Sequence, residues 1–239
     1  MKSTLRVRCA AELLGTGFLV AAVVGSGIMA ERLSGGNVAL ALLANTIATG
    51  AALVSLILTF GPVSGAHLNP VVSIADAMEG GLRWHDMVAY VMAQTCGAVG
   101  GTVVSHAMFG LSLLTRSQHV RSGPAQLLGE FVATFGLLSV VWGCSRSRSG
   151  VVAFAVGCYI TSAYWFTSST SFANPAVTIA RSFSDTFAGI RPVDVPLFVT
   201  AQVGGGVAAT LLFRWLMPPQ GAGRFVVGSQ LLLTRRCDL

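Results

Sequence analysis

Six apolar segments, each long enough to cross a lipid bilayer, are spread along this chain from one end to the other. They lie at about 9–30, 37–60, 86–109, 124–144, 150–167 and 194–217. About 20 apolar residues in a helix span the roughly 30 Å hydrocarbon layer, where only helices and closed barrels satisfy every backbone N–H and C=O group. We therefore expect an all-α membrane protein with six transmembrane helices, forming a single membrane domain over residues 1–217.

The charged residues support a membrane location. Only 10% of the 239 residues are charged, against about 25% in an ordinary soluble domain. The net charge of +6 would suggest a nucleic-acid partner in a soluble protein, but here the basic residues lie between the apolar segments, where they usually set the orientation. We expect no nucleic-acid partner, an inner-membrane location in which the lipid bilayer surrounds the chain, cytoplasmic N- and C-termini, and a cytoplasmic tail at 218–239.

Two shorter segments, 61–79 and 168–190, lie between the predicted spans, and each carries Asn-Pro near its middle. Asparagine is a preferred helix N-cap, and proline is favoured at the first helical position. The stretch from Pro70 to Glu79 is about ten residues, or roughly 15 Å of helix, which is half a bilayer. Each segment is therefore interpreted as a re-entrant half-helix; a turn between soluble or interfacial helices is the alternative for a single Asn-Pro.

The chain also repeats its motifs in the same order. Glu12 is matched by Glu130, each in a short similar stretch, and the Asn-Pro pairs and the Ala-Gln pairs follow in turn. Each half, about 9–109 and 124–217, holds three spans. Because this number is odd, the second half must enter the membrane upside down, which gives an inverted repeat with the two half-helices meeting at the midplane. Their positive dipole ends would repel a cation there, and the asparagine amides would donate hydrogen bonds to a passing solute.

The two Asn-Pro motifs resemble the signatures of the aquaporin, or major intrinsic protein, family. The resemblance covers residues 9 to about 217 and implies the aquaporin fold, a passive pore for small neutral solutes and water, and a homotetramer. Val71 replaces the usual alanine of the first motif, a modest change in bulk at the pore centre. The motif residues are Asn69, Pro70 and Val71 in the first copy, preceded by Ser64-Gly65-Ala66-His67-Leu68, and Asn174, Pro175 and Ala176 in the second.

The resemblance also implies which residues brace the re-entrant loops. Glu12 and Glu130 stand where the family buries glutamates that accept backbone N–H groups of these loops, and His67 matches a supporting position. The other use of a carboxylate inside a membrane is proton carriage. We prefer bracing, because the two copies are symmetric and lack basic partners nearby in the sequence.

Counting from the motifs as in the family places the narrowest constriction on Thr49, Ser162, Ser171 and Val177. The family usually has an arginine at the position of Val177, so a positive charge and several donors are missing. The side chains of the inferred ring are small, neutral and hydroxylated, and we therefore expect a wide opening. Arg181, four residues beyond Val177, is expected to extend to the membrane interface; a cationic contribution to the ring is the alternative.

Such a filter most resembles that of the bacterial aquaporins associated with arsenic resistance. The resemblance implies downhill passage of water, glycerol-like polyols and undissociated arsenite or methylated arsenicals. Arsenous acid is a neutral trihydroxyl molecule with a polarity near that of glycerol, so a hydroxyl-lined pore suits it. The alternative is a secondary transporter built from inverted repeats, which would show saturable, ion-coupled uphill flux.

No residue pattern indicates an enzyme. The histidines show no metal-ligand spacing, and no glycine-rich phosphate loop follows a strand. The serines near Asn174 lack a histidine and an acid in any triad arrangement. We therefore expect no catalytic residues, no metal and no cofactor.

Overall fold

The computed structural model describes residues 3–218. The predicted cytoplasmic tail therefore lies outside the described residues apart from Pro218. The described chain is helical throughout its regular elements, which are α1 (Leu5–Leu33), α2 (Val38–Ser64), α3 (Pro70–Met78), α4 (Trp84–Met108), α5 (Pro124–Ser147), η1 (Ser149–Val151), α6 (Val152–Phe166), α7 (Pro175–Arg181), η2 (Pro192–Asp194) and α8 (Val195–Leu216).

Six helical stretches in this range are long and apolar enough to cross a membrane, as predicted. The difference from the predicted boundaries that affects the site is at the end of α2, which continues to Ser64 through Pro62. Residues 61–64, predicted to belong to the re-entrant segment 61–79, therefore form its last turn. The helix ends only at Gly65, whose left-handed backbone (φ 96°) provides a C-cap conformation that glycine adopts without steric cost.

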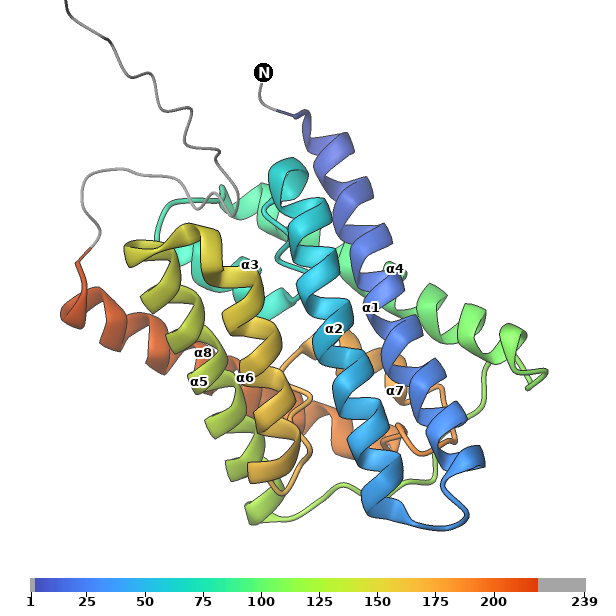
Figure 1. Ribbon diagram of the computed structural model, residues 1–239. Coiled ribbons are helices and arrows are strands. Elements are labelled where there is room, and N and C mark those ends of the chain that lie inside the picture. The colour runs from blue at the N-terminus through green and yellow to red at the C-terminus, as the bar shows by residue number, and fades with distance from the viewer. Residues whose placement is uncertain (1–2, 219–239) are drawn as a thin grey trace, which may run out of the picture.

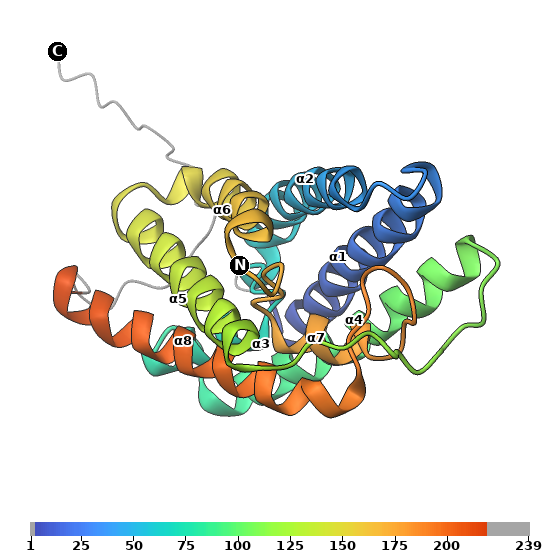
Figure 2. The same ribbon diagram turned by 90° about the horizontal axis from the view of Figure 1, so that it is seen from below.

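The helices form two similar groups (Figure 1). In the first half α1 packs against α4 and α2, and in the second half α5 packs against α8 and α6; α2 and α6 join the halves. The short helices α3 and α7 touch each other and α8. Seen along the bundle, the long helices surround them (Figure 2). We call the end at which α1 begins the N-terminal face, and the end that carries the 109–123 connection the loop face.

The paired helices approach most closely at equivalent glycines in the two halves. A Cβ atom at Gly97 of α4 would collide with the backbone carbonyl of Leu13 on α1, and one at Gly205 of α8 would collide with that of Phe131 on α5. Small residues allow such backbone contact, and packing of this kind drives helix association in lipid, where the hydrophobic effect between helices is absent. Equivalent backbone contacts therefore hold α1 against α4 in the first half and α5 against α8 in the second half.

A cluster of charges holds the end of α3 at the N-terminal face. The side chain of Glu79 accepts hydrogen bonds from Arg146 of α5 and Arg214 of α8, each at 2.8 Å. Arg146 also donates to the carbonyl oxygens of Phe213 and Met217, both at 2.6 Å. The half-helix is therefore tied at this end to α5 and α8.

Candidate functional site

The two asparagines cap the half-helices from inside the bundle. The Oδ1 atom of Asn69 accepts the backbone N–H of Val71 at 2.9 Å, and that of Asn174 accepts the N–H groups of Ala176 at 3.1 Å and Val177 at 3.3 Å. Pro70 and Pro175 occupy the first position of their helices. The predicted start of each half-helix is therefore what the structure has.

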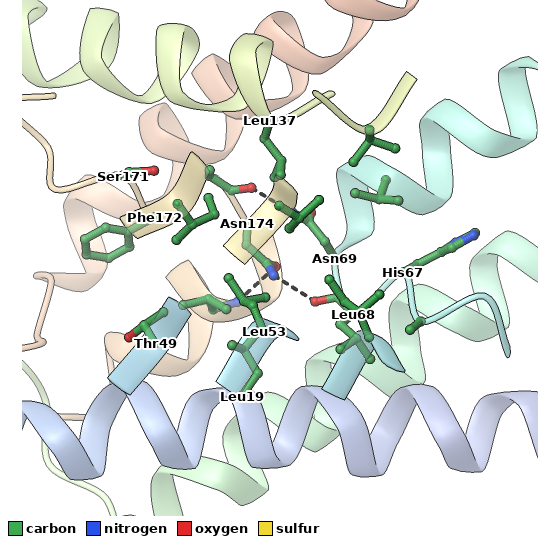
Figure 3. Close-up of a pocket in the computed structure, with 18 of the residues that line it drawn as sticks. Leu19, Thr49, Leu53, His67, Leu68, Asn69, Leu137, Ser171, Phe172 and Asn174 are labelled. Atoms are coloured by element: carbon green, nitrogen blue, oxygen red, sulfur yellow. Dashed lines mark hydrogen bonds between the residues drawn. The ribbon is translucent and has the colours of Figure 1, made fainter. Parts of the chain in front are cut away.

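The same asparagines also join the two re-entrant loops to each other. Asn69 donates from its amide nitrogen to the carbonyl oxygen of Ala173 at 2.7 Å, and Asn174 donates to that of Leu68 at 2.8 Å (Figure 3). Both amides were expected to aim their donors into the pore. Since an amide has two N–H groups, the cross-link uses one of them, and one N–H of each asparagine is left for a solute.

Glu12 is fully buried and holds the first loop. Its Oε1 atom accepts the backbone N–H of His67 at 3.0 Å and the hydroxyl of Ser64 at 2.6 Å, and its Oε2 atom accepts the N–H of Leu68 and the amide of Gln94, both at 2.7 Å. Four hydrogen bonds fill the acceptor sites of a carboxylate. Glu12 does not line the cavity described below.

Glu130 makes the equivalent contacts in the second half. It accepts the N–H groups of Phe172 and Ala173 at 2.9 Å and the amide of Gln202 at 2.6 Å. Gln94 and Gln202 belong to the repeated Ala-Gln pairs, but no role was predicted for either residue. The feature of the sequence that could have identified them is that both occupy the same position in the repeat.

The loops need this support because their backbones are strained. Left-handed φ angles cost side-chain-bearing residues of order 1–3 kcal/mol each, and they persist only where the surroundings impose them. The buried carboxylates, which accept consecutive backbone N–H groups, impose them here. Such φ angles occur at Ala66 (47°), Leu68 (49°), Thr170 (60°), Ser171 (49°) and Ala173 (48°).

His67 lies at the end of the site nearest the N-terminal face, away from Ser171 and Phe172 (Figure 3). Its Nδ1 atom is 3.0 Å from the hydroxyl of Ser73 and its Nε2 atom is 3.6 Å from the carboxylate of Asp76, both on α3. The ring packs edge-on against Tyr90. His67 thus connects the first loop to the half-helix that follows it.

A cavity with an empty volume of about 780 Å³ runs past both asparagines. No aspartate or glutamate lies on its wall, which is mostly apolar. Neither Val71 nor Ala176 reaches it. The expected effect of Val71 on the pore centre is therefore corrected: this side chain packs against Gly206 of α8 instead. The side chains that surround the cavity come from both halves and include Leu19, Leu53, Ile57, Val72, Leu137, Val141, Val156 and Ile160.

Three of the four predicted constriction residues, Thr49, Ser171 and Val177, line this cavity. Ser162 does not. It is exposed and its hydroxyl donates to the carbonyl oxygen of Tyr159 within α6. The prediction for Ser162 is therefore corrected. It failed because a count back from Asn174 crosses a loop, and the length of a loop does not fix the rotation of the preceding helix.

Tyr164 takes the place on α6 that was predicted for Ser162. Tyr164 and Ile160 both line the cavity, four residues apart and hence on one helix face, whereas Ser162 is about 200° of rotation from each. The phenolic hydroxyl of Tyr164 donates to the hydroxyl of Thr49 at 3.2 Å, which joins α6 to α2. The wall is therefore hydroxylated, as predicted, but it carries an aromatic residue.

Arg181 is buried and lines the cavity rather than extending to the membrane interface, which corrects the expectation for it. Its Nε–H donates to the carbonyl oxygen of Ala188, and its guanidinium carbon lies 3.3 Å from the centre of the Phe172 ring. The wall was predicted to be neutral, and this prediction is wrong because Arg181 adds a positive charge to it. The alternative considered for Arg181, a cationic contribution to the ring, matches this geometry.

The chain resembles membrane channels in its match to a family, in its sequence identity to individual proteins and in its fold. It matches the major intrinsic protein family at residues 1–167 and again at 143–234. It is 58% identical to the aquaglyceroporin AqpS of Rhizobium meliloti (strain 1021), over 89% of this chain and 91% of that protein. It is 30% identical to the probable aquaporin NIP7-1 of Arabidopsis thaliana, over 85% of this chain and 74% of that protein. The X-ray structure of the aquaglyceroporin from Plasmodium falciparum has the same fold, with a TM-score of 0.67 and 20% identity, over 88% of this chain and 96% of that one.

Proposed function

Because this chain belongs to the major intrinsic protein family, we propose that its pore passes undissociated arsenite and methylated arsenicals in addition to the solutes of an aquaglyceroporin. The protein is a multi-pass membrane channel for water and glycerol-like solutes, and not an enzyme. Transport through it is passive. AqpS, which this chain matches over 91% of the length of that protein, is named an aquaglyceroporin.

The observation that carries this proposal is the wall of the cavity. It joins hydroxyl groups of Thr49, Tyr164 and Ser171 to a mostly apolar lining and contains no carboxylate. A solute with several hydroxyl groups can exchange its water hydrogen bonds for those of the wall, whereas a cation would lose its hydration shell with little compensation. Arsenous acid and glycerol both carry three neutral hydroxyl groups, so the same wall suits both.

The centre of the pore supplies a second selective element. Each half-helix directs its positive end toward the place where Asn69 and Asn174 join the two loops, and each end is equivalent to about half an elementary charge. Cations are repelled there. Glu12 and Glu130 act by holding the strained loops, and the four hydrogen bonds to Glu12 and three to Glu130 favour this bracing role over proton carriage.

We place the N-terminal face on the cytoplasmic side of the inner membrane. The basic residues at this face support that orientation by the excess of positive charge typical of cytoplasmic loops. A homotetramer with one pore per subunit is proposed from the family. Protease accessibility of a tag at the N-terminus in inside-out vesicles, and cross-linking in the membrane, test these two points. The basic residues are Arg6, Arg8, Arg83, Arg146, Arg148 and Arg214.

The purified protein in proteoliposomes tests the function directly. Light scattering after an osmotic step reports water, glycerol and urea permeability, and arsenic accumulation in the vesicles reports arsenite and methylated arsenicals. We expect each flux to be downhill and linear in concentration. Saturable uphill flux that depends on an ion gradient would instead identify a secondary transporter. Water and glycerol flux without arsenite flux would limit the protein to the aquaglyceroporin role.

A further inference from the structure

We infer that Arg181 and Ser171 form a solute-binding station at the loop-face end of the pore, which selects small solutes with two or more neutral oxygen atoms and repels cations. This inference rests on the proposed function and adds a residue, Arg181, that lies outside the predicted constriction. The ligand class is a small polyol or an undissociated oxyacid. Arg181 supplies several hydrogen-bond donors at one end of the station, and Ser171 supplies a hydroxyl at the other.

The charge of Arg181 is not neutralised by an ion pair. The residue is 2% exposed, and no carboxylate in the described part of the chain lies within ion-pair distance of it. Its Nε–H is used by Ala188 and its planar group is stacked on Phe172. A guanidinium has five N–H groups, so this anchoring leaves the terminal N–H groups for the cavity that Arg181 lines.

A second guanidinium fixes the same ring and adds to the positive charge. Arg121, from the 109–123 connection, lies 4.9 Å from the centre of the Phe172 ring and donates to the carbonyl oxygen of Gly189 at 2.8 Å. Two carboxylates belong to this end of the pore: Glu130 accepts the N–H groups of Phe172 and Ala173, and Asp194 accepts the backbone N–H of Arg121 and pairs with Arg191. In the described part of the chain neither forms an ion pair with the guanidinium of Arg121 or Arg181, so this end of the pore keeps a net positive charge.

Ser171 provides an independent indication of a ligand. Its hydroxyl is buried, lines the cavity and has no hydrogen-bond partner among residues 3–218. A buried hydroxyl without a partner costs about 1–3 kcal/mol, yet the loop holds this residue in a strained conformation that keeps it there. A solute or water in the cavity satisfies the hydroxyl. Ser171 precedes Phe172, on which Arg181 is stacked, so both ends of the station are set by one loop.

Substitution of Ser171 tests the hydrogen-bonding half of the station. Ser171→Ala removes a hydroxyl that no protein group needs, so folding should be unaffected. The proposal predicts that glycerol permeability falls relative to water permeability by about three- to tenfold, the worth of one hydrogen bond. Ser162→Ala is the matched control, because its hydroxyl lies on the exposed side of α6. An unchanged ratio of glycerol to water permeability in Ser171→Ala would overturn the role of Ser171.

Substitution of Arg181 tests the charged half. In vesicles where the wild type conducts water and glycerol, Arg181→Met should raise the sodium and proton leak, measured relative to the water permeability of the same vesicles, by about tenfold or more. Arg181→Lys should retain cation exclusion but lose glycerol permeability, because an ammonium lacks the planar fork. Arg116→Met, an exposed arginine at the same face, is the control. If wild-type and Arg181→Met vesicles exclude cations equally, the charge has no such role and the channel function stands. If the wild type conducts neither solute, the proposed function itself fails.

Discussion

The backbone of Gly206 on α8 lies directly against the side chain of Val71 on α3, with no space between them for a Cβ atom. Val71 is the departure from the usual alanine in the first Asn-Pro motif. Its extra bulk is thus directed away from the pore and accommodated by the absence of a side chain on the neighbouring helix. The two positions should therefore be energetically coupled.

A double-mutant cycle measures that coupling. Gly206→Ala should destabilise the protein by about 1–3 kcal/mol, because overpacking forces side chains or backbone to shift. Val71→Ala alone should cost less, and the double variant should recover most of the stability lost in Gly206→Ala. Thermal unfolding in detergent reports this. Gly100→Ala on α4, where nothing lies within 4 Å, is the control for adding a methyl group. Additive effects of the two substitutions would contradict the packing described.

Loss of a bracing carboxylate should disturb the pore. In Glu130→Gln, one carboxylate oxygen becomes an amide nitrogen that cannot accept the N–H of Phe172 or of Ala173. We expect water and glycerol permeability to fall together by about tenfold, since two donors lose part of their hydrogen bonding. Glu31→Gln, on the exposed end of α1, should have no effect. Normal permeability in Glu130→Gln would show that the loop does not depend on this residue.

Asn174→Asp tests the electrostatic account of the pore centre. The substitution introduces a negative charge beside two positive helix ends and replaces the donor to the carbonyl oxygen of Leu68 by an acceptor. The proton and sodium leak should rise, by about tenfold at an effective dielectric constant near 20. Asn37→Asp is the matched control, because Asn37 caps α2 at the exposed end and aspartate caps equally well. A leak unchanged from the wild type would rule out the dipole contribution.

Val177→Arg tests the size cutoff. Val177 lines the cavity one helical turn from Arg181, so a guanidinium there narrows the passage and adds a second positive charge. We expect glycerol and methylated arsenicals to be suppressed more than water, by about tenfold relative to it. Val193→Arg, at an exposed position on the same face, controls for the added charge. Equal loss for all three solutes, or no loss for any, would show that Val177 does not set the cutoff.

Much of this site follows from residue types and their order. Asn69 and Asn174 predicted both half-helices because capping and the proline preference act locally. The repetition singled out Glu12 and Glu130, the family resemblance implied their bracing role, and each carboxylate accepts N–H groups of its loop in the structure. Gln94 and Gln202 belonged to the same repeat, but their contacts with those carboxylates join helices that are far apart in sequence.

The residues whose predicted positions were wrong all depend on the rotation of a helix about its own axis. Ser162 and Tyr164 differ by two residues on α6, and only the contact of Tyr164 with Thr49 shows which of them faces the cavity. Val71 was expected at the pore centre and lies against Gly206. Arg181 could have reached either the interface or the cavity, and its stacking on Phe172 decides between them.

The sequence by itself determined the six spans, the inverted repeat and the capped half-helices, because span length, apolar composition and capping are properties of a chain segment and its solvent. The tertiary structure alone decided the chemistry of the constriction. Which side chain lines a pore depends on how neighbouring helices are rotated and packed, and that packing is set by contacts such as those between Gly97 and Leu13, or Gly205 and Phe131, on separate helices.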